Sequence, residues 1–498
     1  MPIDQTVAEP DGVLLPQLRE LFYGGKWHTP RHGGRVEVES PATGEVLCTI
    51  ADASPEDVED CVAAARRGFE TWRQVAPLER AKLLKEVAIT LRRHGRELAM
   101  LDAADGGNPF TEMLSDVHVA AGLMDFFAGL VTEIKGVSIP MGPDAVDFSV
   151  RQPRGVVARI IPFNHPFMFC AGKSAAPLAA GNAVIIKPPE QAPLSALRLA
   201  ELIGGILPPG VFNIIPGGRE VGAALSRHPD VAMVALVGSV PTGRAVMKAA
   251  AETIKPVLLE LGGKNALIAY PDSDPEAVAT AIISGMNFTW CGQSCGSTSR
   301  AFLHADIYDA VLSMVAAKVA RFKPGLPTNP ATTMGALASR AQFERTMRYI
   351  ESAKAEGARL VYGGRRPDEP ELANGFFILP TIFADVLPTM TIAREEIFGP
   401  VLSVLRWDDE QDMITEVNRP EYGLTCSIWT RDLRTAHRTA AAVDAGYIWV
   451  NETSRHLPGA PFGGFKQSGL GREECLEELL AFTQEKNIYI NLKPQGAV

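Results

Sequence analysis

The chain lacks the features of a membrane protein or an exported one. No apolar run within its 498 residues reaches the ~18 residues that suggest a membrane-spanning helix. Residues 1–16 carry acids and prolines but no basic region followed by an apolar run, so they do not resemble a signal peptide. We therefore expect a cytoplasmic protein with no membrane partner.

A block of basic residues is also missing. The formal net charge is −10, and short basic clusters such as Arg66-Arg67 lie within helical patterns, where they are typical of solvated faces. Nothing in the sequence offsets the acidic balance, so no nucleic-acid partner is expected.

Cysteine is sparse, with seven residues scattered along the chain. An odd and scattered set is typical of reduced intracellular thiols. No Cys or His cluster completes a metal site, so no metal is expected. Cys291 and Cys295 are too far apart in sequence for a Cys-x-x-Cys redox pair.

What is present is a long α/β pattern. A chain of this length, with 46% hydrophobic residues, predicts more than one folding unit. Strand and helix patterns alternate, and this order is typical of parallel sheets that bind ligands at the carboxyl ends of their strands. The strands are predicted at 155–161, 183–187, 211–215 and 231–237, and the helices at 168–180, 194–206, 220–227 and 242–251.

Further elements flank this series. Ahead of it, apolar spacing predicts helices from Ser54-Pro55 onward, over 77–94 and over 116–133. After Lys264 a second α/β series begins. Its strands are predicted at 265–270, 401–406, 425–429 and 447–450, and its helices at 276–288 and 308–322.

Two segments alternate apolar and polar residues outside this rhythm, at 146–151 and 487–492. They predict half-buried strands that form a small separate sheet. An exposed sheet edge favours pairing with another subunit. A local hairpin that covers the core is the alternative.

Two short stretches place a nucleophile and a carboxylate beside glycines. Cys295 lies in the Gly- and Ser-rich turn 292–297, and Glu260 precedes Gly262-Gly263. A thiol and a carboxylate in such turns are typical of a nucleophile and a base in a pocket. The alternative for a single cysteine is a small core residue.

Three strand ends carry polar residues that could contact a ligand. The turn at Gly238-Ser239 favours a phosphate at a helix start, although a plain strand–helix turn is the alternative. Lys187 and Glu190 end another strand, where a carboxylate can bind ribose hydroxyls or simply face solvent. Asn164 could donate to an oxyanion or cap a turn. The neighbouring His165 could act as a base or simply line the pocket.

Together these motifs resemble the aldehyde dehydrogenase superfamily, of the NAD-dependent hydrolytic type. They follow the family's order and spacing over roughly residues 20–492. The motifs are Phe163-Asn164, Lys187-Pro188-Pro189-Glu190, Gly238-Ser239, Glu260 to Lys264, Gly292 to Cys295, Glu395 to Pro400 and Pro461 to Gly469.

The resemblance implies two αβα domains with parallel sheets and a small oligomerisation sheet. The Rossmann-like cofactor domain would comprise 1–134 and 154–262, and the catalytic domain 263–476. The oligomerisation segments would be 135–153 and 477–498, in a homodimer or homotetramer.

The resemblance also implies roles for individual residues. Cys295 would be the nucleophile that forms a thiohemiacetal and then a thioester. Asn164 and the Cys295 backbone N–H would bind the oxyanion, Glu260 would activate water, and Lys173 would support both. The residues implied to bind NAD are Ile161, Pro162, Phe163, Lys187, Glu190, Gly238, Ser239, Leu261, Glu396 and Phe398. Glu190 favours NAD over NADP, because its carboxylate would repel a 2′-phosphate.

The sequence departs from the family pattern in the cofactor turn and in the substrate tunnel. Leu236-Val237 replaces the usual Phe-Thr before Gly238, and Phe163 replaces a Trp. Gly172 stands where many members have a Trp, which predicts a wider tunnel. With Phe169, Trp290 and Leu457 as further walls, a bulky apolar or aromatic aldehyde is expected. A betaine-aldehyde-type substrate held by cation–π contact is the alternative.

Other activities within this fold remain to be weighed. An acylating relative transfers the thioester to coenzyme A and a phosphorylating one uses phosphate, but both disagree with the presence of Glu260. A structural protein without catalysis disagrees with an intact set of Cys295, Glu260 and Asn164. Cys291 lies one turn before Cys295 if the segment is helical, which would allow a reversible disulfide; a packed structural thiol is the alternative.

Overall fold

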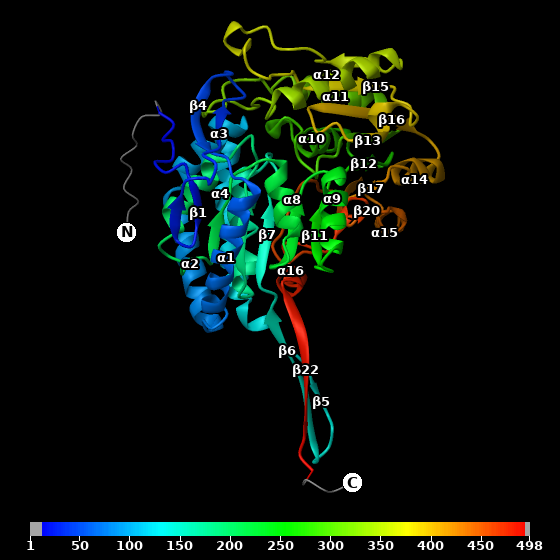
Figure 1. Cartoon of the computed structure of the whole chain (residues 1–498). Helices are drawn as coiled ribbons and strands as arrows, with labels where there is room; N and C mark the ends of the chain where they lie inside the picture. The colour runs from blue at the N-terminus through cyan, green and yellow to red at the C-terminus, as the bar shows by residue number, and fades with distance from the viewer. Residues whose placement is uncertain (1–11, 494–498) are drawn as a thin grey trace, which may run out of the picture.

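The computed structural model describes residues 12–493. Residues 1–11 of the predicted cofactor domain and 494–498 of the predicted oligomerisation segment lie outside this range. Two large sheets with helices around them form the body, and a narrow arm extends from it (Figure 1).

The first sheet has eight strands with a parallel centre. β7, β8, β9, β10 and β11 run parallel, while β1 and β21 join antiparallel at either side. In spatial order the strands are β2 (Lys26–His28), β1 (Leu21–Tyr23), β9 (Phe212–Ile214), β8 (Ala183–Lys187), β7 (Val156–Ile160), β10 (Val231–Val237), β11 (Val257–Glu260) and β21 (Gly469–Leu470).

Both faces of this sheet are buried. Successive side chains of a strand point to opposite faces: Val184 lies in one hydrophobic core, while Ala183 and Ile185 lie in the other. Apolar residues on both faces are typical of parallel sheets covered by helices. One core includes α2 (Pro77–Arg93), α3 (Gly95–Gly106), α4 (Phe110–Gly129), α5 (Pro166–Gly172), α6 (Ala175–Ala179) and α7 (Leu194–Ile203); the other includes α1 (Pro55–Trp72), α8 (Arg219–Arg227) and α9 (Val240–Ala251).

The second sheet has seven strands, all parallel except β14. Its strands are β14 (Arg359–Tyr362), β15 (Thr381–Ala384), β16 (Val401–Trp407), β13 (Arg300–His304), β12 (Ala266–Ala269), β18 (Thr425–Trp429) and β19 (Tyr447–Val450). Its helices are α10 (Pro275–Gly285), α11 (Tyr308–Val319), α12 (Arg340–Ala355), α13 (Thr391–Arg394), α14 (Glu410–Asn418) and α15 (Leu433–Ala442). The predicted α/β class with two parallel sheets is therefore confirmed.

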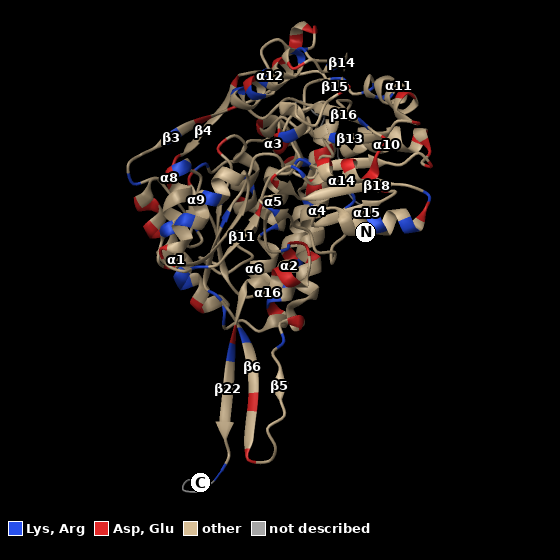
Figure 2. Cartoon of the chain, turned by 90° about the vertical axis from the view of Figure 1, so that its right-hand side faces the viewer, with Lys and Arg blue, Asp and Glu red and all other residues tan. Residues whose placement is uncertain are grey.

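The two alternating segments pair with each other. β6 (Ala145–Pro153) and β22 (Thr483–Asn491) form an antiparallel ladder, with β5 (Ser138–Ile139) on the other edge of β6. The alternative of a local hairpin is wrong for β22, because its partner is distant in sequence. These strands form the arm in Figure 1, and Figure 2 shows few charged residues along its outer half.

Segments from the end of the chain return to the first sheet. β21 pairs with β11, and Phe482, just beyond α16 (Leu476–Ala481), is buried in the core beneath α6. Residues 469–470 thus join the cofactor-side sheet, although the predicted boundary assigned them to the catalytic domain. Smaller pairs are β3 (Arg35–Glu39) with β4 (Val46–Ala51) and β17 (Tyr422–Gly423) with β20 (Phe465–Lys466).

Two helix predictions need correction. α4 begins at Phe110 rather than near Asp116, and α3 before it was not predicted. The predicted helix over 168–180 is two helices, separated at Lys173-Ser174. Pro177 explains the break, because its ring would clash with the carbonyl of the residue four positions earlier, Lys173. Within residues 12–493, no helix is both long and apolar enough to cross a bilayer.

Candidate active site

The polar residues predicted at strand ends gather at one edge of the first sheet. Glu260 ends β11 beside Val237 of β10, and the N–H of Gly238 donates to the Glu260 carbonyl over 3.0 Å. Lys187 ends β8, and Asn164 follows β7. Since these strands are parallel, their carboxyl ends meet, as expected for a ligand site in such sheets.

Cys295 lies in an irregular loop rather than a helix. The short helix η2 (Phe288–Trp290) ends at Cys291, whose φ is +54°, and Gly292 continues with φ +66°. These left-handed residues turn the chain away from a helical path. The helical spacing that would bring Cys291 to Cys295 is therefore wrong. The Cys291 thiol is buried and donates to the Gly335 carbonyl at 3.2 Å.

Asn265 holds the loop that carries Cys295 in place. Its side-chain amide donates to the Cys295 carbonyl at 2.6 Å and to the Ser297 carbonyl at 3.0 Å, and its oxygen accepts from the Thr425 N–H at 3.0 Å. A side chain with both donors and an acceptor satisfied is fixed in orientation. The Cys295 backbone thus has a defined position beside the second sheet.

The Cys295 thiol faces the Glu260 carboxylate. Burial and the Glu473 charge raise the pKa of Glu260 to about 8, despite the opposing effect of its contact with Cys295. Burial and the Glu260 charge raise the pKa of the Cys295 thiol well above its usual value. Desolvation disfavours the charged form of both groups. Near neutral pH both Glu260 and Cys295 are therefore mainly protonated and uncharged.

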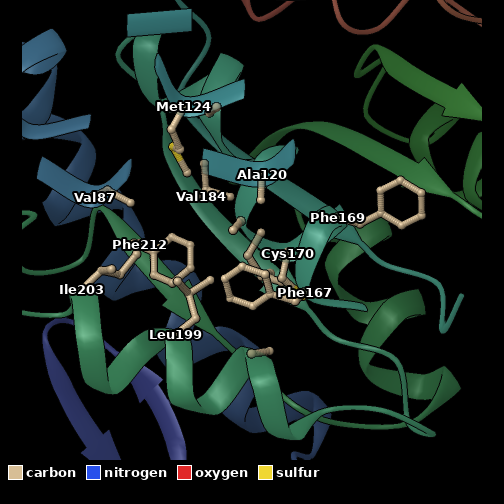
Figure 3. Close-up of a cluster of buried hydrophobic side chains, with 14 of the residues drawn as sticks. Val87, Ala120, Met124, Phe167, Phe169, Cys170, Val184, Leu199, Ile203 and Phe212 are labelled. Carbon is tan, nitrogen blue, oxygen red and sulfur yellow. The ribbon is translucent and has the colours of Figure 1, made fainter. Parts of the chain in front are cut away.

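A cavity of about 460 Å³ opens on one side of this pair. Its volume lies in the usual range for small-molecule sites. Phe169 and Trp290, which the sequence predicted as walls of a substrate tunnel, line this cavity. Figure 3 shows the Phe169 ring set apart from the packed side chains of Phe167 and Leu199. Other lining residues are Asp116, Val119, Leu123, His165, Met168, Lys173, Trp449, His456, Phe462, Glu473 and Glu474.

A second cavity, of about 290 Å³, lies on the other side. Cys295 and Glu260 line both cavities, so the thiol stands in the wall between them. Among the predicted site residues, this second cavity is lined by Ile161, Pro162, Phe163, Asn164, Gly238, Ser239, Glu396 and Phe398. Gln342 and Arg345 line it too, and were not predicted.

A third cavity, of about 570 Å³, adjoins the second, because Ile160 and Thr242 line both. Lys187 and Glu190 lie here, 3.9 Å apart between charged atoms. Arg219 lines the same space and was not predicted. The second and third cavities together form an elongated site along the strand ends.

The glycines after Glu260 allow a close approach of Glu396. A Cβ at Gly262 would lie 2.2 Å from a Glu396 carboxylate oxygen, so any other residue there would displace this carboxylate. The carboxylate accepts the Gly263 N–H at 2.9 Å. Arg345 donates to the Glu396 carbonyl at 2.6 Å. Glu396 is thereby fixed at the wall of the second cavity.

Lys173 belongs to an ionic cluster in the wall of the first cavity. Its Nζ lies 2.9 Å from Glu473 and 3.4 Å from Glu474, and Arg159 also pairs with Glu473, at 2.9 Å. Burial alone would lower the pKa of Lys173, but Glu473 and Glu474 outweigh it and raise that pKa. Lys173 is thus a fixed cation near Cys295 and Glu260.

Three predicted residues do not line the cavities. A Cβ at Gly172 would lie 3.0 Å from Leu123 and 3.4 Å from Ala120 of α4, so this glycine permits close packing of α5 on α4. Leu123 itself lines the first cavity, and the effect of Gly172 on the width of that cavity stays a prediction. Leu457 is 60% exposed, and the Leu261 side chain packs against Gly243 of α9.

Several lining residues escaped the sequence analysis. Asp116 and Glu474 are ordinary helix or loop acids by pattern, and only their neighbours in space reveal them. Asn265 directly follows the Glu260 to Lys264 motif, which was the signal available for it. Within the described residues, no group of three or more His, Cys, Asp or Glu side chains could hold a metal ion.

Two parallel sheets with helices around them, and a thiol and a carboxylate between two cavities, are typical of an α/β enzyme. The sequence profile described as the aldehyde dehydrogenase family matches residues 27–488. The chain belongs to this family.

Individual relatives agree over nearly the whole length. The chain is 51% identical over 486 residues to aldehyde dehydrogenase tropH of Talaromyces stipitatus, covering 96% of this chain and 94% of that protein. It is 40% identical over 478 residues to betaine aldehyde dehydrogenase of Cereibacter sphaeroides, covering 96% and 98%. The solved NAD+ complex of Bacillus cereus aldehyde dehydrogenase superimposes with a TM-score of 0.93 at 38% identity, covering 96% and 98%.

Proposed function

We propose that this enzyme oxidises an aldehyde to the carboxylic acid with NAD, through a thiohemiacetal and a thioester on Cys295. The observation that carries the proposal is the position of Cys295 and Glu260 in the wall shared by two cavities. An aldehyde can reach the thiol from one side and a dinucleotide from the other. A nucleophile and a base in contact are what covalent catalysis followed by hydrolysis needs.

The residues of the second and third cavities fit a dinucleotide. Gly238, Ser239 and Thr242 line the second cavity at the start of α9. The positive end of the helix dipole there suits a pyrophosphate. Glu396 would accept hydrogen bonds from the nicotinamide ribose. At the adenosine ribose Glu190 would accept hydrogen bonds and Lys187 would donate one. When bound, NAD supplies the hydride acceptor and a positive charge that favours the thiolate.

In the first half of the reaction, the Cys295 thiol releases its proton to solvent, its sulfur attacks the aldehyde carbon, and the carbonyl oxygen becomes an oxyanion. No protein acceptor of the Cys295 N–H occurs among residues 12–493, so this donor is available to the oxyanion. The Asn164 side-chain amide lines the same cavity and is the second donor. Loss of hydride from the former carbonyl carbon then leaves a thioester on Cys295.

In the second half, Glu260 removes a proton from water, which attacks the thioester carbon and expels the Cys295 thiolate. Glu260 Oε1 is buried and forms no hydrogen bond with the described residues, so it can accept one from a water molecule. Transfer to coenzyme A or phosphate would not need this base. A catalytically silent protein would not need the thiol either.

The substrate that the cavity favours is a bulky apolar or aromatic aldehyde. Phe169, Trp290, Trp449 and Phe462 present rings to it. The same rings could surround a trimethylammonium group, as a betaine-aldehyde-type substrate would require. The acids Glu473 and Glu474 do not favour a cation, because Lys173 already pairs with both.

The function is tested by following NADH formation with short aliphatic, long aliphatic, aromatic and trimethylammonium aldehydes. NAD and NADP are compared, with and without coenzyme A. We expect turnover without coenzyme A, faster with NAD than with NADP because Glu190 repels a 2′-phosphate. Aromatic aldehydes should give the highest kcat/KM. Turnover only with coenzyme A would contradict the hydrolytic mechanism.

We also propose that the arm forms a homodimer or homotetramer. It carries exposed apolar side chains, and unpaired strand edges favour association. The exposed apolar side chains of the arm are Val137, Ile139, Met141, Val146, Tyr489, Ile490 and Leu492.

The double variant Ile490→Lys/Leu492→Lys should lower the molar mass measured by light scattering towards that of the monomer. Leu433→Lys, on α15, is the matched control and should not. A monomeric wild type would contradict the proposal.

A further inference from the structure

A histidine and an aspartate form a pair in the substrate-side cavity, apart from Cys295 and Glu260. His165 Nδ1 lies 2.7 Å from Asp116 Oδ2, and both residues line the cavity. We propose that this pair selects aldehydes that carry a hydroxyl group on an aromatic ring. The inference rests on the proposed function and specifies its substrate class.

The pair sets the chemistry of the free ring nitrogen. Asp116 is buried and its carboxylate accepts, so Nδ1 must carry the hydrogen. In the neutral imidazole Nε2 is then an acceptor. Nε2 forms no hydrogen bond with any residue from 12 to 493 and is not among the fully buried unpartnered atoms. It is therefore available to a ligand.

The backbone around His165 is held by α3 and by the loop that follows it. Asn108 donates to the Asn164 carbonyl at 2.9 Å, and Asp102 accepts the Phe167 N–H at 2.9 Å. These buried contacts lie on both sides of His165 in sequence. A side chain whose backbone and one ring nitrogen are both fixed loses little freedom on binding, which favours selective recognition.

Aromatic rings flank the imidazole. Its centroid lies 5.4 Å from the Phe169 ring and 5.5 Å from the Trp290 ring. These apolar walls suit the flat faces of a benzene ring, while Nε2 accepts its hydroxyl. A carboxylate in place of the hydroxyl would meet the negative charge of Asp116, so carboxylated rings are disfavoured. The acceptor nitrogen and the aromatic rings beside it together point to a hydroxyaryl aldehyde as the substrate.

The test compares benzaldehyde with its 2-, 3- and 4-hydroxy and 4-carboxy derivatives, using kcat/KM for NADH formation. One hydroxy isomer should exceed benzaldehyde by about tenfold or more, because a site built to bind a hydroxyl discriminates against analogues without it. In His165→Phe, which keeps an aromatic ring, this ratio should fall to about one. Equal losses for both substrates would show a purely structural role and overturn the proposal.

Asp116 acts through His165 as a positioning residue. Asp116→Asn can donate to Nδ1 and so turn Nε2 into a donor, which should lower the hydroxy-to-benzaldehyde ratio without further effect in His165→Phe. His118→Ala, exposed on the same helix, is the matched control and should keep the wild-type ratio. A wild-type preference for 4-carboxybenzaldehyde would overturn the proposal. Absence of turnover with every aldehyde, propionaldehyde included, would instead refute the proposed function.

Discussion

Cys295→Ala is expected to lower aldehyde oxidation by at least about a thousandfold, because losing a catalytic nucleophile costs that much or more. The variant can form neither the thiohemiacetal nor the thioester. NAD binding should stay near the wild-type Kd, because the predicted cofactor contacts come from other residues of the second and third cavities. Steady-state NADH formation and a calorimetric titration with NAD measure the two quantities.

Cys291→Ala is the matched control for this prediction. Cys291 is close in sequence, but its thiol is buried in the second core and donates to Gly335. Removing it should lower the melting temperature slightly and leave turnover nearly unchanged. Turnover near wild type in Cys295→Ala would exclude Cys295 as the nucleophile. A large loss in Cys291→Ala alone would move that assignment to Cys291.

Glu260→Gln is expected to give one rapid equivalent of NADH per active site and then almost none. The first half of the reaction survives, because removing the Glu260 charge also removes an effect that raises the pKa of the Cys295 thiol. Hydrolysis stalls, because an amide cannot take a proton from water; loss of a general base typically costs about a hundredfold to ten-thousandfold. Stopped-flow absorbance of NADH resolves the burst from the steady state.

The pH dependence of hydrolysis follows from the same carboxylate. Burial, with the Glu473 charge, raises the pKa of Glu260 to about 8, so the protonated and inactive form dominates below that pH. The rate of thioester hydrolysis should therefore rise roughly tenfold per pH unit up to about pH 8 and then level off. Glu260→Gln should lose this slope. A normal steady state in the variant would show that another group activates water.

Much of the fold follows from local pattern. The strands β8, β10 and β18 lie where their apolar runs predicted them, because a strand buried on both faces needs such a run wherever it folds. The end of α5 did not follow from periodicity, since the apolar pattern continues past Lys173. Pro177 interrupts the helix there, and its effect on a residue four positions earlier is easily missed.

Some residues of the site could likewise be predicted from local sequence, and others could not. Glu260 and Cys295 could be predicted because each lies in a recognisable glycine-rich turn. The structure shows why glycine stands beside Glu260: a Cβ at Gly262 would meet the Glu396 carboxylate, and one at Gly263 would lie 2.9 Å from the Cys295 carbonyl oxygen. Gly172 shows what the sequence leaves open, namely the direction in which an added Cβ would point. In the structure that direction is toward Leu123 of α4.

The sequence by itself thus determined the family, the two parallel sheets and the residues of the thiol–carboxylate pair, since these depend on short motifs and regular periodicity. Only the tertiary structure decided what surrounds that pair. Asp116 meets His165 across 49 residues, and Lys173 meets Glu474 across 301. Such contacts arise where helices and loops from distant parts of the chain pack together. That packing decides which residues come into contact, and the local sequence does not indicate it.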